Sequence, residues 1–176
     1  MVELRQLHTF RVFEPVDSPT DRPIRCRFLR VWKNVEGGRK AKSRLIVSAY
    51  NDPRDVPTAT SLPHGAIRRL LHCVGLSLGF NGATMDIKTA FIQVPLPEST
   101  TVYVQLPPDI PAEADSMGLQ PHGVYRLRRA LYGLKESPRL FVNHLQCLLE
   151  SKGWRCVQPG TFVLLDSGQA IQAICS

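Results

Sequence analysis

One acidic residue lies in a segment that could do chemistry. Asp86 belongs to Met85–Phe91, an otherwise largely apolar stretch that we expect to be buried. A buried carboxylate needs a metal ion, a cation or hydrogen-bond donors. Asp86 could cap a following helix or pair with Lys88, or it could bind magnesium, which one or two carboxylates and substrate oxygens hold at phosphate sites. The segment alone leaves these alternatives open.

A second segment, Leu131–Arg139, could approach and bind an anion. Its sequence is Leu-Tyr-Gly-Leu-Lys-Glu-Ser-Pro-Arg. Gly133 would let the backbone come close to a ligand, and the helix start predicted at Ser137-Pro138 would offer unpaired amide donors. Lys135 and Arg139 would add positive charge. An ordinary loop and helix cap is the alternative.

Positive charge is concentrated between Arg22 and Arg44, where nine basic residues accompany Glu36 as the only acid. Apolar and basic residues alternate there, Ile24, Cys26 and Phe28 against Arg25 and Arg27. This pattern predicts a strand with one packed and one cationic face. The net charge of +7 suits an anionic partner such as nucleic acid, and a merely solvated cationic face is the alternative.

Composition limits the class of protein. A length of 176 residues with 43% hydrophobic content suits one folded domain. The five cysteines lack the spacing of zinc ligands, so we expect reduced core thiols. No apolar run approaches the roughly 20 residues of a membrane span, and residues 1–10 lack a signal-peptide core. We therefore expect an intracellular protein, cytoplasmic or nuclear, without a membrane partner.

Local patterns predict the elements that must position these residues. In chain order they are an extended connector within 1–23, two strands within 24–47 joined around Glu36-Gly37-Gly38, a core helix over 66–78 closed by Gly79, strands over 84–88 and 102–106, a surface loop over 109–123, a helix from Ser137 to Gly153, and a hairpin over 161–174.

Taken in order, the motifs resemble the reverse transcriptases of Ty1/copia-type retrotransposons. That family carries Asp-Val-Lys-Thr-Ala-Phe, a Val-Tyr-Val strand before a double proline, and Leu-Tyr-Gly-Leu-Lys followed by Pro-Arg. The similar blocks lie here at 86–91, 102–108 and 131–139, and 27–33 and 42–47 are similar to the family's finger strands. The resemblance spans Arg22 to Val163, and three ordered blocks make it specific.

The resemblance implies roles for individual residues. Asp86 would be the first metal-binding aspartate, with the carbonyl of Ile87 as another ligand. Two Mg²⁺ ions would activate the primer hydroxyl and stabilise the leaving pyrophosphate. Phe91 would exclude a 2′-hydroxyl, and Arg44 would bind the triphosphate of the incoming dNTP. The remaining contacts to nucleotide and template-primer would come from Tyr132, Gly133 and Lys135, and from Arg25, Arg27, Lys40, Lys42 and Arg139.

The chain departs from the family pattern in three places. Residues 92–94 are Ile-Gln-Val where the family has Leu-Asn-Gly, and residues 48–50 are Ser-Ala-Tyr where it has Ala-Arg-Gly. The family's Tyr-Val-Asp-Asp, which supplies two more metal-binding aspartates, does not occur in 161–176. We therefore expect a truncated enzyme that does not polymerise DNA by itself and self-associates through its exposed C-terminal strand.

These inferences predict an α+β fold, the fingers and partial palm of a right-hand polymerase with an antiparallel palm sheet backed by helices. Residues 1–23 would be the connector, 24–83 the fingers and 84–176 the partial palm. The function would be that of an RNA-directed DNA polymerase, a nucleotidyltransferase acting on dNTPs and an RNA or DNA template-primer. The alternatives are a non-catalytic basic nucleic-acid-binding module and an interaction domain unrelated to polymerases.

Overall fold

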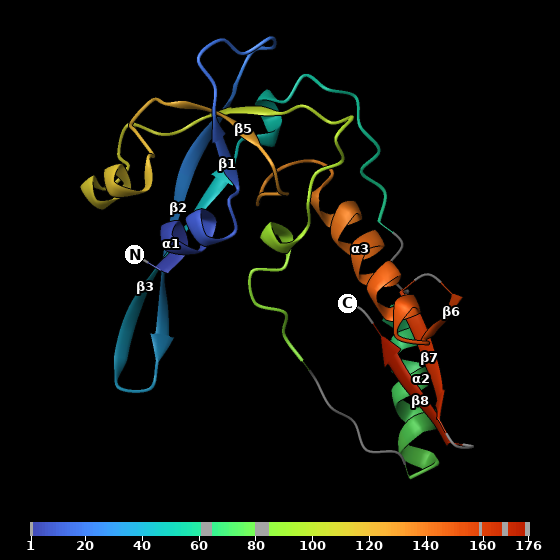
Figure 1. Ribbon diagram of the computed structural model, residues 1–176. Helices are drawn as coiled ribbons and strands as arrows, with labels where there is room; N and C mark the ends of the chain where they lie inside the picture. Colours follow the sequence, from blue (N-terminus) through green and yellow to red (C-terminus); the bar gives the residue numbers. More distant parts are fainter. Residues whose placement is uncertain (1, 61–64, 80–84, 159, 167–168, 175–176) are drawn as a thin grey trace. The chain divides into compact units, whose positions relative to one another are not determined.

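The structure is a computed structural model that describes residues 2–60, 65–79, 85–158, 160–166 and 169–174 (Figure 1). The chain divides into two compact units. Unit 1 comprises Met1–Thr58 and Thr89–Leu140, and unit 2 comprises Ala59–Lys88 and Phe141–Ser176. Helices and β-sheet occur in both, which confirms the expected α+β class.

Unit 1 is organised around a five-stranded sheet. The strand order is β1 (Phe13–Pro15), β5 (Val124–Leu127), β4 (Tyr103–Gln105), β2 (Ile24–Val35) and β3 (Gly38–Val47). Neighbouring strands are antiparallel except β2 and β4, which pair in parallel. The short strands β1, β4 and β5 pair near the base of the long β2–β3 hairpin, which extends beyond them (Figure 1).

The β2–β3 hairpin confirms the prediction from alternation. Val35 pairs with Gly38, and Gly37 supplies the positive φ of 88° that the turn needs. Cys26 is buried on one face of β2, while Arg25 and Arg27 are exposed on the other. Burial raises the pKa of the Cys26 thiol to about 12, so this cysteine is the inert core thiol that was expected.

The N-terminal segment differs from the prediction of an extended connector. Helix α1 (Val2–Thr9) buries Leu4 and Leu7 and contacts β3 and the short helix η3 (Ala112–Met117). The expectation of an extended connector is wrong over these residues, because two leucines three residues apart form an apolar helix face. Strand β1, also within 1–23, then pairs with β5, which the sequence analysis had not predicted.

Unit 2 contains α2 (Gly65–Ser77), most of α3 (Ser137–Ser151) and an antiparallel sheet of β6 (Arg155–Gln158), β7 (Thr161–Asp166) and β8 (Gln169–Ile174). Both predicted helices and the final hairpin are confirmed, and Gly153 ends the α3 region with a φ of 87°. Strand β8 lies at the edge of its sheet, and nothing among the described residues supports self-association through it.

Three expectations for unit 2 are wrong. Leu70, Val74 and Leu78 are exposed, so the described part of α2 is not a core helix. Cys73 and Cys147 are exposed rather than core thiols, and Cys175 lies outside the described residues. Residues 85–87 are irregular rather than a strand, and Thr84 also lies outside the described part. Among the described residues, no helix has the length and apolar character needed to cross a membrane.

Candidate functional site

Local pairing places Phe91 beside the Leu-Tyr-Gly-Leu motif within unit 1. Phe91 begins the short helix η2 (Phe91–Gln93), and the segment after it runs antiparallel to residues 128–130. The amide of Ala130 donates to the carbonyl of Val94 at 2.9 Å, and the amide of Leu96 donates to the carbonyl of Arg128 at 3.0 Å. The chain that leaves this pairing is Leu131-Tyr132, so η2 and the motif lie next to each other.

The same motif also packs against the end of β3. The amide of Val47 donates to the carbonyl of Tyr132 at 2.7 Å. Gly133 follows with a φ of 84°, and a Cβ atom at this position would overlap the carbonyl oxygen of Val47. Glycine is therefore required twice here, by the backbone conformation and by the close approach of β3.

Three of the predicted nucleotide-binding residues meet as a result. The rings of Phe91 and Tyr132 contact edge to face, with centroids 5.0 Å apart and planes at 65°. The guanidinium carbon of Arg44 lies 5.1 Å from the centroid of the Tyr132 ring, in a cation–π contact. We call Arg44, Phe91 and Tyr132 the aromatic–arginine cluster. Its members come from three segments far apart in the sequence.

A buried ionic network, which the sequence analysis missed, holds the loop beside this motif. The Arg54 guanidinium donates to both oxygens of Asp52, at 2.9 and 2.7 Å, and to both oxygens of Glu136, at 2.8 and 3.0 Å. Asp52 and Glu136 are only 4% and 3% exposed. One arginine thus bridges two buried carboxylates and ties the segment after β3 to the start of α3.

Lys135 and Arg139 have structural partners rather than an open anion site. The Lys135 ammonium donates to the carbonyls of Asp52 and Arg54 at 2.7 and 3.1 Å. Arg139 Nε donates to the carbonyl of Pro57 at 2.9 Å. Both cations therefore fasten residues 52–57 to the helix start, and their predicted contacts with nucleotide or nucleic acid remain proposals.

The network gives folding a pH dependence. Burial raises the pKa of Asp52, but hydrogen bonds and charge from Arg54, with the charge of Lys135, outweigh it and lower the pKa below the ordinary value of 3.8. A lowered pKa stabilises the fold above pH 3.8, and this contribution is lost as pH falls through the folded-state value.

We expect the difference in unfolding free energy between the native chain and Asp52→Asn to shrink below pH 4. Urea denaturation at pH 7, 5 and 3.5 measures it, and a constant difference would contradict this assignment.

Asp86 and Ile87, the predicted metal ligands, belong to unit 2. Asp86 is exposed, as are its neighbours Met85 at 90% and Ile87 at 42%, so the expectation of a buried carboxylate is wrong. In the part of the chain that the structure describes, no three metal-ligating side chains gather into a group. These residues alone do not fit a site for two Mg²⁺ ions, and we derive no catalytic step through such ions.

The four basic residues predicted on the hairpin share one face. Arg25 and Arg27 on β2 and Lys40 and Lys42 on β3 all belong to the face that carries Arg44, because Leu29 pairs with Arg44, Val31 with Lys42 and Lys33 with Lys40. We call this the cationic face. Lys42 and Lys40 lie toward the hairpin tip from Arg44, and Arg27 and Arg25 lie toward the base of the hairpin.

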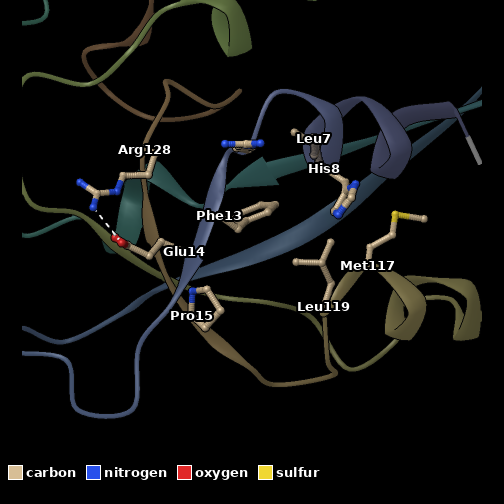
Figure 2. Close-up of a pocket in the computed structure, with 9 residues that line it drawn as sticks. Leu7, His8, Phe13, Glu14, Pro15, Met117, Leu119 and Arg128 are labelled. Atoms are coloured by element: carbon tan, nitrogen blue, oxygen red, sulfur yellow. Dashed lines mark hydrogen bonds and ion pairs between the residues drawn. The ribbon is translucent and has the colours of Figure 1, made fainter.

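Unit 1 also has an open hollow of about 550 Å³ between α1, β1 and η3 (Figure 2). Phe13, His8 and Met117 face it, and an ion pair between Arg128 and Glu14, 2.8 Å apart, closes one side. None of the residues predicted from the sequence lines this hollow. The candidate site is therefore the aromatic–arginine cluster with its cationic face.

A sequence model of the reverse transcriptase (RNA-dependent DNA polymerase) family matches residues 10–169, and the chain belongs to that family. It is similar to the Retrovirus-related Pol polyprotein from transposon RE2 of Arabidopsis thaliana, with 28% identity over 93% of this chain and 11% of that protein. It is also similar to the Pol polyprotein from transposon TNT 1-94 of Nicotiana tabacum, with 25% identity over 85% of this chain and 11% of that protein.

The chain thus spans about 11% of the length of these relatives. No solved structure matches it significantly. The matches confirm the predicted Ty1/copia-type reverse transcriptase and overturn the alternative of an interaction domain unrelated to polymerases.

Proposed function

We propose that this chain forms the nucleotide-binding part of an RNA-directed DNA polymerase, with its fingers and part of its palm. The supporting observation is the convergence of Arg44, Phe91 and Tyr132. A guanidinium offers several donors to a triphosphate, and the cation–π contact with Tyr132, 5.1 Å from the ring centroid, would hold Arg44 in position. Phe91 would exclude the 2′-hydroxyl of a ribonucleotide by its bulk, and Gly133 would keep Tyr132 in place.

Further assignments complete this proposal. We assign 24–83 to the fingers and 84–176 to the partial palm, and Asp86 and the Ile87 carbonyl to a metal site that needs additional carboxylates. Lys135 would support nucleotide binding indirectly, because its hydrogen bonds to the carbonyls of Asp52 and Arg54 hold residues 52–54 beside the Leu-Tyr-Gly-Leu motif. The substrates would be dNTPs and an RNA or DNA template-primer.

Nucleotide affinity tests the cluster. We expect Arg44→Ala to weaken dGTP binding about tenfold, because one charge-assisted contact to phosphate is lost. We expect Phe91→Ala to bring the affinity for GTP up to that for dGTP, since the excluded hydroxyl now has space. Isothermal titration of the purified chain with each nucleotide in magnesium buffer measures both effects.

Arg128→Ala is the matched control, because Arg128 is an arginine of the same unit whose exposed ion pair lies outside the cluster. It should leave both affinities unchanged. If Arg44→Ala and Arg128→Ala bind dGTP equally well, the cluster is not a triphosphate site.

The cationic face supports a second candidate, the nucleic-acid-binding module. Lys33 lies directly opposite Lys40, and like charges in opposite positions destabilise a strand pair. Bound phosphates would neutralise these charges and remove the repulsion between them. We propose that Arg25, Arg27, Lys40 and Lys42 bind the backbone of a template-primer, with Arg139 at the helix start as a further contact.

Salt dependence tests this face. We expect binding to a primer-template duplex to weaken steeply with salt, and Lys40→Gln and Lys42→Gln each to reduce the slope of log K against log salt concentration by about 1. Fluorescence anisotropy between 50 and 200 mM salt measures the slopes. Asp86→Asn should leave the salt slope unchanged. Equal slopes for the native chain and both lysine variants would exclude the cationic face as the surface that binds the duplex.

A further inference from the structure

The opposite face of the hairpin carries an exposed tryptophan that the proposed function does not use. Every residue from Leu29 to Ala41 is exposed, and Figure 1 shows the hairpin end extending away from the other strands of unit 1. Trp32 is 72% exposed. Exposure alone does not distinguish Trp32, because single exposed apolar residues are common on protein surfaces, so the inference depends on its neighbours.

The neighbours of Trp32 leave its ring open and surround it with hydrogen-bonding groups. Its cross-strand partner is Ala41, whose methyl group covers little of an indole ring. Arg30 and Asn34 flank it along β2, and Arg39 lies opposite Asn34 on the same face. The tryptophan is thus an open aromatic surface between two arginines.

We propose that Trp32 stacks on an unpaired base of a single-stranded nucleic acid whose phosphates contact Arg30 and Arg39, an inference that rests on the proposed polymerase function. Charge favours this occupant, because Glu36 is the only acid among nine basic residues between Arg22 and Arg44. Arg30 also pairs with Asp109 at 2.7 Å, and because both side chains are at least half exposed, a phosphate can take the place of that carboxylate. Every base has a flat face that can stack on an aromatic ring, so the contact would be tolerant of sequence. The hairpin would then bind the backbone of a template-primer with the cationic face and a single strand with the face that carries Trp32.

The test compares oligomers that have equal charge but differ in whether they carry bases. A dT 12-mer and a fully abasic 12-mer present the same phosphates. We expect the native chain to bind the dT oligomer at least about fivefold more tightly than the abasic one, the effect of one stacked base. Trp32→Ala should bind both equally, and Trp32→Phe should keep part of the preference.

Fluorescence gives an independent readout. The chain contains two tryptophans, so Trp154→Phe leaves Trp32 as the only indole. Its emission should be quenched by the dT oligomer and not by the abasic one. Val31→Ala is the matched control, because Val31 is the adjacent residue on the opposite face and is 42% exposed. This variant should retain the full preference for dT.

The outcomes separate this inference from the proposed function. Equal affinity of Trp32→Ala and the native chain for dT, or equal quenching by both oligomers, would overturn the stacking role. Binding of dGTP depends on the aromatic–arginine cluster and should be unchanged in Trp32→Ala. Loss of the dT preference with normal dGTP binding would support the inference.

Discussion

Replacement of Arg54 by methionine is expected to destabilise unit 1 by about 3–5 kcal/mol. Arg54 is the bridge between Asp52 and Glu136, and both of these carboxylates are almost fully buried. Methionine fills a similar volume but leaves two buried negative charges without the guanidinium that bridges them. The cost of breaking such a group exceeds the worth of the intact ion pairs, because the remaining charges have lost their access to water.

The pH dependence of this loss identifies its cause. Without Arg54, the burial that raises the pKa of Asp52 is no longer outweighed by the hydrogen bonds and charge of the guanidinium, so the pKa of Asp52 would rise above its ordinary value. A raised pKa adds stability as pH falls, and the deficit of Arg54→Met should therefore narrow between pH 7 and pH 5. Urea denaturation followed by circular dichroism at both pH values measures it.

Arg128→Met is the matched control for the same change of residue. Arg128 and Glu14 form an ion pair of the same length, 2.8 Å, but their side chains are 47% and 42% exposed. Exposed pairs contribute about 0–1 kcal/mol, so this variant should be nearly as stable as the native chain. Similar losses for both arginines would mean that burial of the carboxylates does not govern the network.

The network also shows where prediction from sequence ends. Alternation and glycine turns predicted the β2–β3 hairpin, and helical periodicity predicted α2 and α3, because those signals are local. Strand β5 has only four residues, and its partners, β1 and β4, are remote in sequence. No local pattern encodes such pairing. The same holds for Arg54, whose second carboxylate lies 82 residues further along the chain.

The candidate site likewise has features that the sequence predicts and features that it does not. The motif resemblance selected Arg44, Phe91 and Tyr132, and the structure brings these three together. The resemblance could not reveal that Lys135 would be held by two backbone carbonyls. The apolar residues around Asp86 predict a buried segment, but Met85 and Ile87 are exposed. Hydrophobic composition predicts burial only where another surface packs against it.

Replacement of Gly133 by alanine is expected to destabilise unit 1 by roughly 2–5 kcal/mol, and it tests how the cluster is built. The positive φ of 84° strains any residue with a Cβ atom, and that atom would also overlap the carbonyl oxygen of Val47. The backbone cannot simply move apart, because the amide of Val47 donates to the carbonyl of Tyr132 at 2.7 Å. Urea denaturation measures the loss.

Gly118→Ala separates the two contributions. Gly118 has a similar φ of 72°, but a Cβ atom there would meet nothing within 4 Å, so alanine should cost only about 1–2 kcal/mol for the backbone conformation. The additional loss of unfolding free energy in Gly133→Ala, compared with Gly118→Ala, then measures the effect of the close approach of β3. Because relief of the overlap must displace Tyr132 from Phe91 and Arg44, Gly133→Ala should also weaken dGTP binding under conditions where the chain is still folded. Gly118→Ala should bind dGTP normally, and equal behaviour of the two variants would mean that the approach of Val47 does not position the cluster.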